Sequence, residues 1–449
     1  MRNIFWSVLV GIVVFPSCSE EAGNYQEFTE DPILYCKTVK KLNDVVLENN
    51  FPPMIATRNY AYANIAAYET MVAGNPQFQS LAGQIKHLPE MPKPEAGKTI
   101  DFALASLFSF TKVGNAVTFP EGSMMAYYDE LKEQARDAGM TSEILRNTLA
   151  FSDTVVATIL KWSKKDNYAE TRSAEKFTVR DEEGRWVPTP PMYAQAIEPK
   201  WNSIRCLAID SCSQFMPPRP PAYDMKNKNG VFFKSLMEVK NIGDSLTEEQ
   251  KHIADFWDDN PFKLNVSGHV MFATKKFSPA GHWMNIVGIA AKEAKADFAT
   301  TVAAYAETSI ALFDAFISCW DEKYRSNFIR PETAINRHLS EEWRPYIQTP
   351  PFPSYTSGHA TTSAAAAEVM THWFGDKLSF TDTSSLEFGI ESRRINSFRD
   401  AAQEAAMSRL YGGIHYRFDN IEGNIYGKKL GEFVVQRLNF KKQNLLSTK

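Results

Sequence analysis

Residues 351–370 read Pro-Phe-Pro-Ser-Tyr-Thr-Ser-Gly-His-Ala-Thr-Thr-Ser-Ala-Ala-Ala-Ala-Glu-Val-Met. The prolines keep the start of this stretch extended, because proline fixes its own φ and disfavours a helical conformation at the residue before it. Ser357 is a typical N-cap, and the four consecutive alanines favour a helix behind it. The stretch therefore predicts a helix whose first backbone N–H groups open toward a ligand above Ser357.

Two cations lie upstream of this predicted helix, in the segment Lys323-Tyr-Arg-Ser-Asn-Phe-Ile-Arg330, which Pro331 closes. Lys323 and Arg330 are seven residues apart, and two turns of helix would place both side chains on one face. The segment therefore predicts a short helical surface that carries two positive charges.

A third cation, Arg409, lies downstream in Ser408-Arg-Leu-Tyr-Gly-Gly-Ile-His-Tyr-Arg-Phe-Asp419. Gly412 and Gly413 would each cost a helix interior about 1 kcal/mol relative to alanine. We therefore expect a break in the helix at these glycines, which presents His415 to its surroundings.

Together these residues suit a tetrahedral oxyanion. Arg330 and Arg409 supply planar forks of donors, and Lys323 supplies a point charge. Ser357 and the Gly358 N–H add neutral donors, and glycine lets the backbone approach a ligand closely. A basic cluster is usually solvated surface, but here three cations and two histidines recur in one region of a slightly acidic chain.

The three segments, in their order and spacing, resemble the signature of the vanadium-dependent haloperoxidase and type-2 phosphatidic acid phosphatase superfamily, over about the last third of the chain. Trp320 and Phe352 resemble the haloperoxidase branch, in which they would line the halide pocket. The pattern Phe-Trp-Asp-Asp-Asn-Pro at residues 256–261 is similar to bacterial haloperoxidase-like proteins. The implied fold is all-α, with two helical bundles of the vanadium chloroperoxidase and acid phosphatase type.

The resemblance also implies a role for each site residue. His415 would bond directly to the central atom, vanadium or phosphorus, with its other ring nitrogen held by Asp419 or a backbone carbonyl. His359 would act as acid or base at the apical oxygen, and Asp259 or its neighbour Asp258 would orient one cation. The residues implied to hold the oxyanion, vanadate or phosphate in the same site, are Lys323, Arg330, Ser357, Gly358, Arg409 and His415.

Two activities fit these residues. A haloperoxidase would oxidise a halide with hydrogen peroxide to hypohalous acid, with Lys323 polarising the bound peroxide. A phosphatase would use His415 as nucleophile and His359 to protonate the leaving group. Trp320 and Phe352 favour the peroxidase. We expect iodide as the first halide and bromide as the second, because iodide is the easiest halide to oxidise. The third hypothesis is a binding protein that has kept these site residues but not the catalytic activity.

The composition of the chain indicates the broad class of the protein. The chain has 449 residues, of which 44% are hydrophobic and 23% charged, with a net charge of −4. These values predict a globular protein with a large core, and they give no reason to expect a nucleic-acid partner. Apolar residues recur at three- and four-residue spacing in 32–49, 54–72, 100–111, 122–139, 141–164, 247–258, 283–324 and 416–438.

The first residues are typical of an export signal. A short basic start is followed by an apolar run, Ile4 to Phe15, that is too short to span a bilayer well. Ser17-Cys18 resembles a lipoprotein processing site, in which Cys18 carries lipid. We expect residues 1–18 to be the signal and 19–30 a tether, with the protein in the periplasm or on the outer membrane, or secreted if it is not lipidated. A lipid anchor is then the expected membrane contact.

The remaining chain divides into three expected parts: an N-terminal helical half over 31–164, a proline-rich irregular insertion over 165–228, and a C-terminal helical half over 229–449 that carries the site. Trp186 and Trp201 are expected to anchor the insertion. Cys206 and Cys212 are close enough in sequence for a disulfide, which an exported protein permits; buried free thiols are the equal alternative. The oligomeric state is left open.

Overall fold

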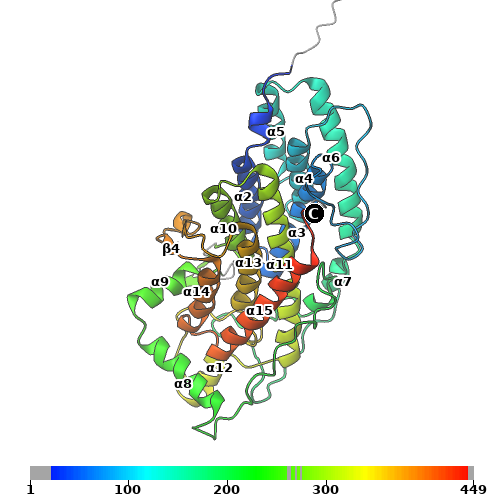
Figure 1. Cartoon of the computed structure of the whole chain (residues 1–449). Coiled ribbons are helices and arrows are strands. Elements are labelled where there is room, and N and C mark those ends of the chain that lie inside the picture. Colours follow the sequence, from blue (N-terminus) through cyan, green and yellow to red (C-terminus); the bar gives the residue numbers. More distant parts are fainter. Residues whose placement is uncertain (1–21, 260–263, 268–269, 274–275, 443–449) are drawn as a thin grey trace, which may run out of the picture.

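The computed structural model describes residues 22–259, 264–267, 270–273 and 276–442, and it is built mainly of α-helices (Figure 1). The all-α prediction is therefore confirmed. Residues 1–21, with the expected signal and Cys18, lie outside the described residues. The helices of the first part of the chain are α1 (Gln26–Thr29), α2 (Pro32–Glu48), α3 (Pro53–Val72), α4 (Phe102–Val117), α5 (Met125–Asp137), α6 (Ser142–Ser163) and α7 (Tyr168–Arg172).

The second part of the chain adds longer helices and two small antiparallel hairpins. The hairpins pair β1 (Leu264–Ser267) with β2 (Val270–Ala273) and β3 (Phe380–Asp382) with β4 (Arg393–Ile395). Two short 3₁₀ helices are η1 (Trp201–Ser203) and η2 (Leu386–Phe388). The α-helices are α8 (Val231–Asp244), α9 (Glu248–Phe256), α10 (Pro279–Glu293), α11 (Phe298–Ser326), α12 (Pro331–His338), α13 (Gly358–Phe374), α14 (Phe398–Tyr411) and α15 (Arg417–Arg437).

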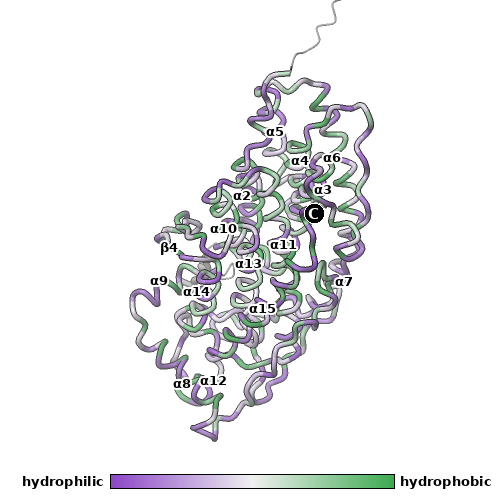
Figure 2. Tube along the Cα trace, in the orientation of Figure 1, coloured by the Kyte–Doolittle hydropathy of each residue, from purple (hydrophilic) through white to green (hydrophobic). Residues whose placement is uncertain are grey.

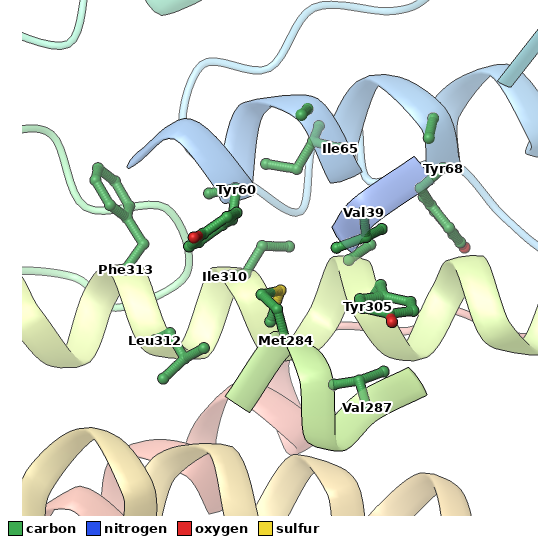
Figure 3. Packing of buried hydrophobic residues seen from close by; sticks show 14 of the residues in the cluster. Val39, Tyr60, Ile65, Tyr68, Met284, Val287, Tyr305, Ile310, Leu312 and Phe313 are labelled. Carbon is green, nitrogen blue, oxygen red and sulfur yellow. The ribbon is translucent and has the colours of Figure 1, made fainter. Parts of the chain in front are cut away.

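Helix α11 is the central element of the core. It packs against α2 and α3 on one side and against α13 and α15 on the other. Figure 3 shows side chains of α2, α3, α10 and α11 meeting in one apolar cluster, with Tyr60, Met284 and Ile310 among them. Figure 2 shows the complementary pattern, with hydrophilic segments at the outer edge near α5 and α7. The site is therefore built on a buried scaffold.

Among the described residues, α11 is the one helix long and apolar enough to cross a membrane, and every residue of its apolar window is buried inside the protein. A core helix has the same composition, so its burial explains its apolar character.

Close packing between α13 and α15 depends on the glycines that recur at four-residue spacing in α15. A Cβ on Gly427 would lie 2.2 Å from the Thr361 carbonyl oxygen, and one on Gly431 would lie 2.5 Å from the Ala365 carbonyl oxygen. These glycines therefore serve close helix contact. They bring α15 against the helix that begins at Ser357.

The proline-rich segment is irregular and attached to the site scaffold. Trp186 and Trp201 are fully buried, as predicted. The Ile197 carbonyl accepts hydrogen bonds from Trp320 Nε1 at 3.3 Å and from the Tyr324 hydroxyl at 2.6 Å. This segment thereby holds the last turns of α11. The two neighbouring cysteines of this region, Cys206 and Cys212, are both free thiols, so the disulfide is absent.

Candidate active site

One pocket collects most of the residues singled out in the sequence. The volume of this pocket that is open to the centres of water molecules is about 40 Å³. It lies where α11, the N-termini of α10 and α13, and the loop after α14 meet. Its lining residues are Pro53, Asp259, Pro279, Phe316, Trp320, Pro350, Phe352, Gly358, His359, Arg409, Ile414 and His415.

Lys323 lies in the last turn of α11 and is fully buried. Its Nζ donates to the carbonyl oxygens of Pro353 at 3.0 Å and Ser354 at 2.9 Å, and also to that of Thr356. Burial lowers its pKa to about 7. Lys323 therefore fixes the loop that leads to Ser357, and it brings its charge to the site from behind that loop.

The structure corrects the prediction that Lys323 and Arg330 share one helix face. Helix α11 ends at Ser326, because Asn327 adopts a left-handed conformation with φ of 46°. Arg330 is instead the N-cap of α12, whose first residue is Pro331. Asparagine tolerates this conformation better than most residues, so it can end a helix where glycine is absent.

Arg330 is buried and only partly satisfied by the protein. Nε donates to the Phe352 carbonyl and Nη1 to the Ile414 carbonyl, both at 2.8 Å. Nη1 also lies 3.1 Å from His415 Nε2. Nη2 has no hydrogen-bond partner within the described part of the chain. Burial lowers the pKa of Arg330 to about 9, although the nearby charge of Asp419 raises it.

Arg409 shows the same incomplete pairing from the opposite side of the pocket. It lies in the last turn of α14, and Nη1 donates to the Trp257 carbonyl at 2.7 Å. Its Nε is buried without a partner among the residues described. Burial lowers the pKa of Arg409, although the nearby charges of Asp258 and Asp259 raise it.

Ser357 and Gly358 occupy the predicted positions at the start of α13. Ser357 is the N-cap, and its Oγ accepts from the Ala360 N–H at 3.4 Å. A Cβ on Gly358 would meet only the Trp320 ring, at an ordinary contact distance of 3.7 Å. Protein packing therefore does not require glycine here, and the open pocket above it leaves its backbone accessible to a ligand.

His415 follows the predicted break. Helix α14 ends at Tyr411, and Gly413 has φ of 75°, so the expected break is confirmed. His415 Nδ1 is 2.8 Å from Asp419 Oδ2, which selects the carboxylate from the two partners considered. Burial and the nearby cations lower the pKa of His415 well below its usual range. With Nδ1–H donated to Asp419, the neutral ring carries its lone pair on Nε2.

His359 and Asp259 face each other across a gap. His359 Nε2 lies 3.7 Å from Asp259 Oδ2, and neither atom has a hydrogen-bond partner in the described ranges. Burial first, and then the charges of Arg409 and His282, lower the pKa of His359 well below its usual range. Asp259 was expected to orient a cation by pairing with it. Its contacts are with two histidines, and its effect on Arg409 is through charge alone.

Aromatic side chains form an apolar wall of the pocket. The rings of Trp320 and Phe352 lie 5.0 Å apart between centroids. Lys323 Nζ lies 5.1 Å from the Phe352 centroid, and the Arg330 guanidinium lies 5.0 Å from it. The ring faces therefore stabilise the cations without neutralising them.

Three residues that support the site were not predicted from the sequence. Ser354 donates to Asp419 and lies behind His415, and its place three residues before Ser357 was a signal that could have been used. His282 is fully buried behind Asp259, and no motif in the sequence marks it. Asp382, its second partner, lies in a short strand far along the chain, where nothing in the sequence marks it.

The donor set fits a tetrahedral oxyanion. Three buried cations surround the pocket, and two of their nitrogen atoms, Arg330 Nη2 and Arg409 Nε, are buried there without partners in the part of the chain that the structure describes. Buried donors without acceptors are costly, and an anion with several oxygens would satisfy them together. His415 Nε2 adds one neutral ligand atom for the central atom of such an anion.

Comparison with known proteins agrees with this geometry. Residues 303–443 match the family model of the second helical-bundle domain of vanadium chloroperoxidase. The chain is similar to a bacterial vanadium-dependent iodoperoxidase at 42% sequence identity and a TM-score of 0.87, over 92% of this chain and 98% of that one. A search of curated proteins found no match.

Two further structures share the fold at low identity. A holo-type bacterial vanadium-dependent chloroperoxidase is 18% identical with a TM-score of 0.63, over 86% of this chain and 93% of that one. An apo-type chloroperoxidase is 17% identical with a TM-score of 0.64, over 86% and 95%.

Proposed function

Because this chain belongs to the vanadium-dependent haloperoxidase family, we propose that it uses vanadate to oxidise iodide with hydrogen peroxide to hypoiodous acid. The observation that carries the proposal is the set of buried, partner-free donors around His415. The relative's activity toward iodide supports the choice of halide. Bromide is the second halide, because it is harder to oxidise.

The cations and the start of α13 hold the oxyanion. Arg330 Nη2 and Arg409 Nε donate to its oxygens, and Ser357 with the Gly358 N–H adds neutral donors. Lys323 fixes the loop that leads to Ser357 by hydrogen bonds, and its positive charge lies behind that loop. When bound, vanadate supplies a Lewis acid that activates hydrogen peroxide toward halide attack. His415 Nε2 would be the protein ligand of the vanadate, and Asp419 keeps the ring in the tautomer that this requires.

His359 is the residue that accepts a proton from hydrogen peroxide. Its Nε2 has no hydrogen-bond partner among the residues that the structure describes, and its lowered pKa keeps the ring neutral, so it can accept a proton from hydrogen peroxide as the peroxide binds. Asp259 Oδ2 lies close enough to stabilise the imidazolium that results. Trp320 and Phe352 give the halide a desolvated approach beside the cations.

The small pocket supports peroxide and halide as substrates over bulky phosphate esters, although a phosphatase would use the same cations and histidines. Purified protein, with and without vanadate, should be assayed for oxidation of iodide, bromide and chloride, and for phosphate-ester hydrolysis. We expect vanadate-dependent iodide oxidation. The proposal fails if the vanadate-loaded protein oxidises no halide while the vanadate-free protein hydrolyses phosphate esters efficiently.

We further propose that the protein is exported and anchored through lipid on Cys18. The basic start, the apolar run and the acidic residues after Cys18 support this. In cells, Cys18→Ala should move the protein from the membrane fraction to the soluble fraction, or leave it unprocessed, with its intrinsic activity unchanged. Unchanged fractionation on immunoblots would contradict the anchor.

A further inference from the structure

A second cluster of buried charges lies directly behind the pocket, centred on His282. This residue is in the first turn of α10 and is fully buried. Its Nδ1 is 3.0 Å from Asp259 Oδ1, and its Nε2 is 2.9 Å from Asp382 Oδ2. Both ring nitrogens therefore face carboxylates from distant parts of the chain.

The geometry requires two protons in this cluster. Ionised carboxylates only accept hydrogen bonds, so a ring that bonds to both must donate from both nitrogens, as an imidazolium does. Burial alone lowers the pKa of His282, but Asp259 and Asp382 raise it to about 10. The ring also lies on the face of Trp257, at 4.6 Å between centroids and 24° between planes, which suits a cation.

Asp259 connects this cluster to the pocket. One oxygen is held by His282, and the other faces His359 at 3.7 Å. Asp259 also lies close enough to Arg409 for its charge to act on that cation, yet no ion pair joins the two side chains in the described structure. If the carboxylate were free to turn, it could pair with Arg409 Nε, which is buried and has no partner in the described ranges of the chain.

We propose that His282 is a positioning residue, which is held between Asp259 and Asp382 and keeps the Asp259 carboxylate facing His359 and away from Arg409. The arrangement leaves Arg409 free for an oxyanion and keeps an anion beside the histidine that accepts the proton. This inference rests on the proposed function for the role of His359, but the charge state of His282 and its effect on anion binding can be measured without halide oxidation.

The first test is the protonation of the ring. In ¹⁵N-histidine-labelled protein without vanadate, assigned with His282→Gln, both ring nitrogens of His282 should be protonated at neutral pH and should remain so into the alkaline range. Asp382→Asn should allow the ring to become neutral at a lower pH. A neutral His282 tautomer at pH 7 in the parent protein would overturn the proposal.

The second test is a double-mutant cycle on phosphate affinity, with His282→Gln, Asp259→Asn and the double variant. His282→Gln should weaken phosphate binding about tenfold, within the range for residues that orient ligands. In the Asp259→Asn background the same change should have little effect, because residue 259 no longer carries the negative charge that could turn toward Arg409. His372→Gln changes an exposed histidine outside the pocket; it is the control and should match the parent.

A purely structural role predicts another outcome. The two substitutions would then lower stability and phosphate affinity additively, and additivity would refute the proposal. If His282→Gln does not fold, Asp382→Asn replaces it in the cycle, because it removes one of the two carboxylates that hold the ring. If the vanadate-loaded parent protein oxidises no halide, the proposed function is refuted instead. The protonation of His282 and the phosphate affinities can still be interpreted in that case.

Discussion

Arg58 and Arg330 are both buried, but of the two only Arg58 has an ion-paired carboxylate in the described structure. Arg58, in α3, is 6% exposed, and its Nε donates to Asp166 Oδ2 at 2.7 Å. Its guanidinium also lies over the rings of Tyr62 and Tyr168, at 4.9 and 4.4 Å from the centroids. Arg58 therefore has its counterion and its packing within the protein.

Arg330 has backbone carbonyls and a histidine around it, and its Nη2 has no hydrogen-bond partner among the described residues. A buried cation without its own anion is unfavourable for the protein alone. An anion that binds there recovers this cost, because a ligand that binds only the folded state stabilises it. The difference distinguishes an arginine that supports the fold from one that awaits a ligand.

The largest expected effect comes from the ligand atom beside Arg330. His415→Ala should abolish tight vanadate binding and halide oxidation, because no other described residue offers a neutral nitrogen in that position. The helical fold should persist, since the change opens space in the pocket and leaves the α11 core intact. Vanadium content of the purified variant checks this, with His372→Ala as the control; vanadium at the parent stoichiometry would rule out the ligand assignment.

Arg330→Met should lower halide oxidation by about two to three orders of magnitude, the scale for loss of one preorganised donor at a reacting oxyanion. Methionine keeps much of the volume, and no ion-paired carboxylate is orphaned, so the free energy of unfolding should change less than it does in Arg58→Met. Steady-state kinetics and urea unfolding measure the two effects. A large loss of stability with normal turnover would reverse the comparison.

The sequence predicted which residues meet at the site, because their types and spacing carry the chemistry. It did not predict how Arg330 arrives there. A seven-residue spacing is compatible with one helix, and the left-handed Asn327 that ends α11 has no strong sequence mark. The break at Gly412 and Gly413 was predictable, because glycine is costly within a helix and Gly413 does adopt a positive φ.

The cluster behind the site was not predictable. His282 and Asp382 are a hundred residues apart, and a lone histidine at the start of an apolar helix is most often a core residue. Their relation exists only because the β3 strand and the N-terminus of α10 pack together. Short motifs reveal residues that contact the ligand, whereas the residues that orient them come from the tertiary structure.

Arg58→Met is the corresponding substitution at the arginine that is ion-paired within the protein. It should lower the free energy of unfolding by about 3 to 5 kcal/mol, because it leaves Asp166 buried without its cation. Turnover per folded molecule should equal that of the parent, since Arg58 does not line the pocket. Urea unfolding with kinetics on the folded fraction checks this. If stability were unaffected, the Arg58 pair would not support the fold.

The smallest expected effect, counted per pH unit, is a pH dependence of stability that separates the two kinds of buried cation. The pKa of Lys323 is lowered from 10.5 to about 7, chiefly by burial. Between these values the unfolded chain binds a proton at Lys323 that the folded, anion-free protein has lost. The free energy of unfolding should therefore rise with pH across this window, by about 1 kcal/mol per pH unit from this group.

A bound oxyanion should reduce that slope, because its charge favours the protonated lysine and restores the pKa of Lys323 toward its usual value. Sulfate suits the measurement, since its own charge does not change in this range. Urea unfolding at several pH values, with and without saturating sulfate, gives the two slopes, and Lys323→Met supplies the background from other groups. If the parent and Lys323→Met share one slope without sulfate, Lys323 is charged in the anion-free protein at all these pH values. The cations of the site would then be compensated within the protein, as Arg58 is, and the distinction between the two regions would disappear.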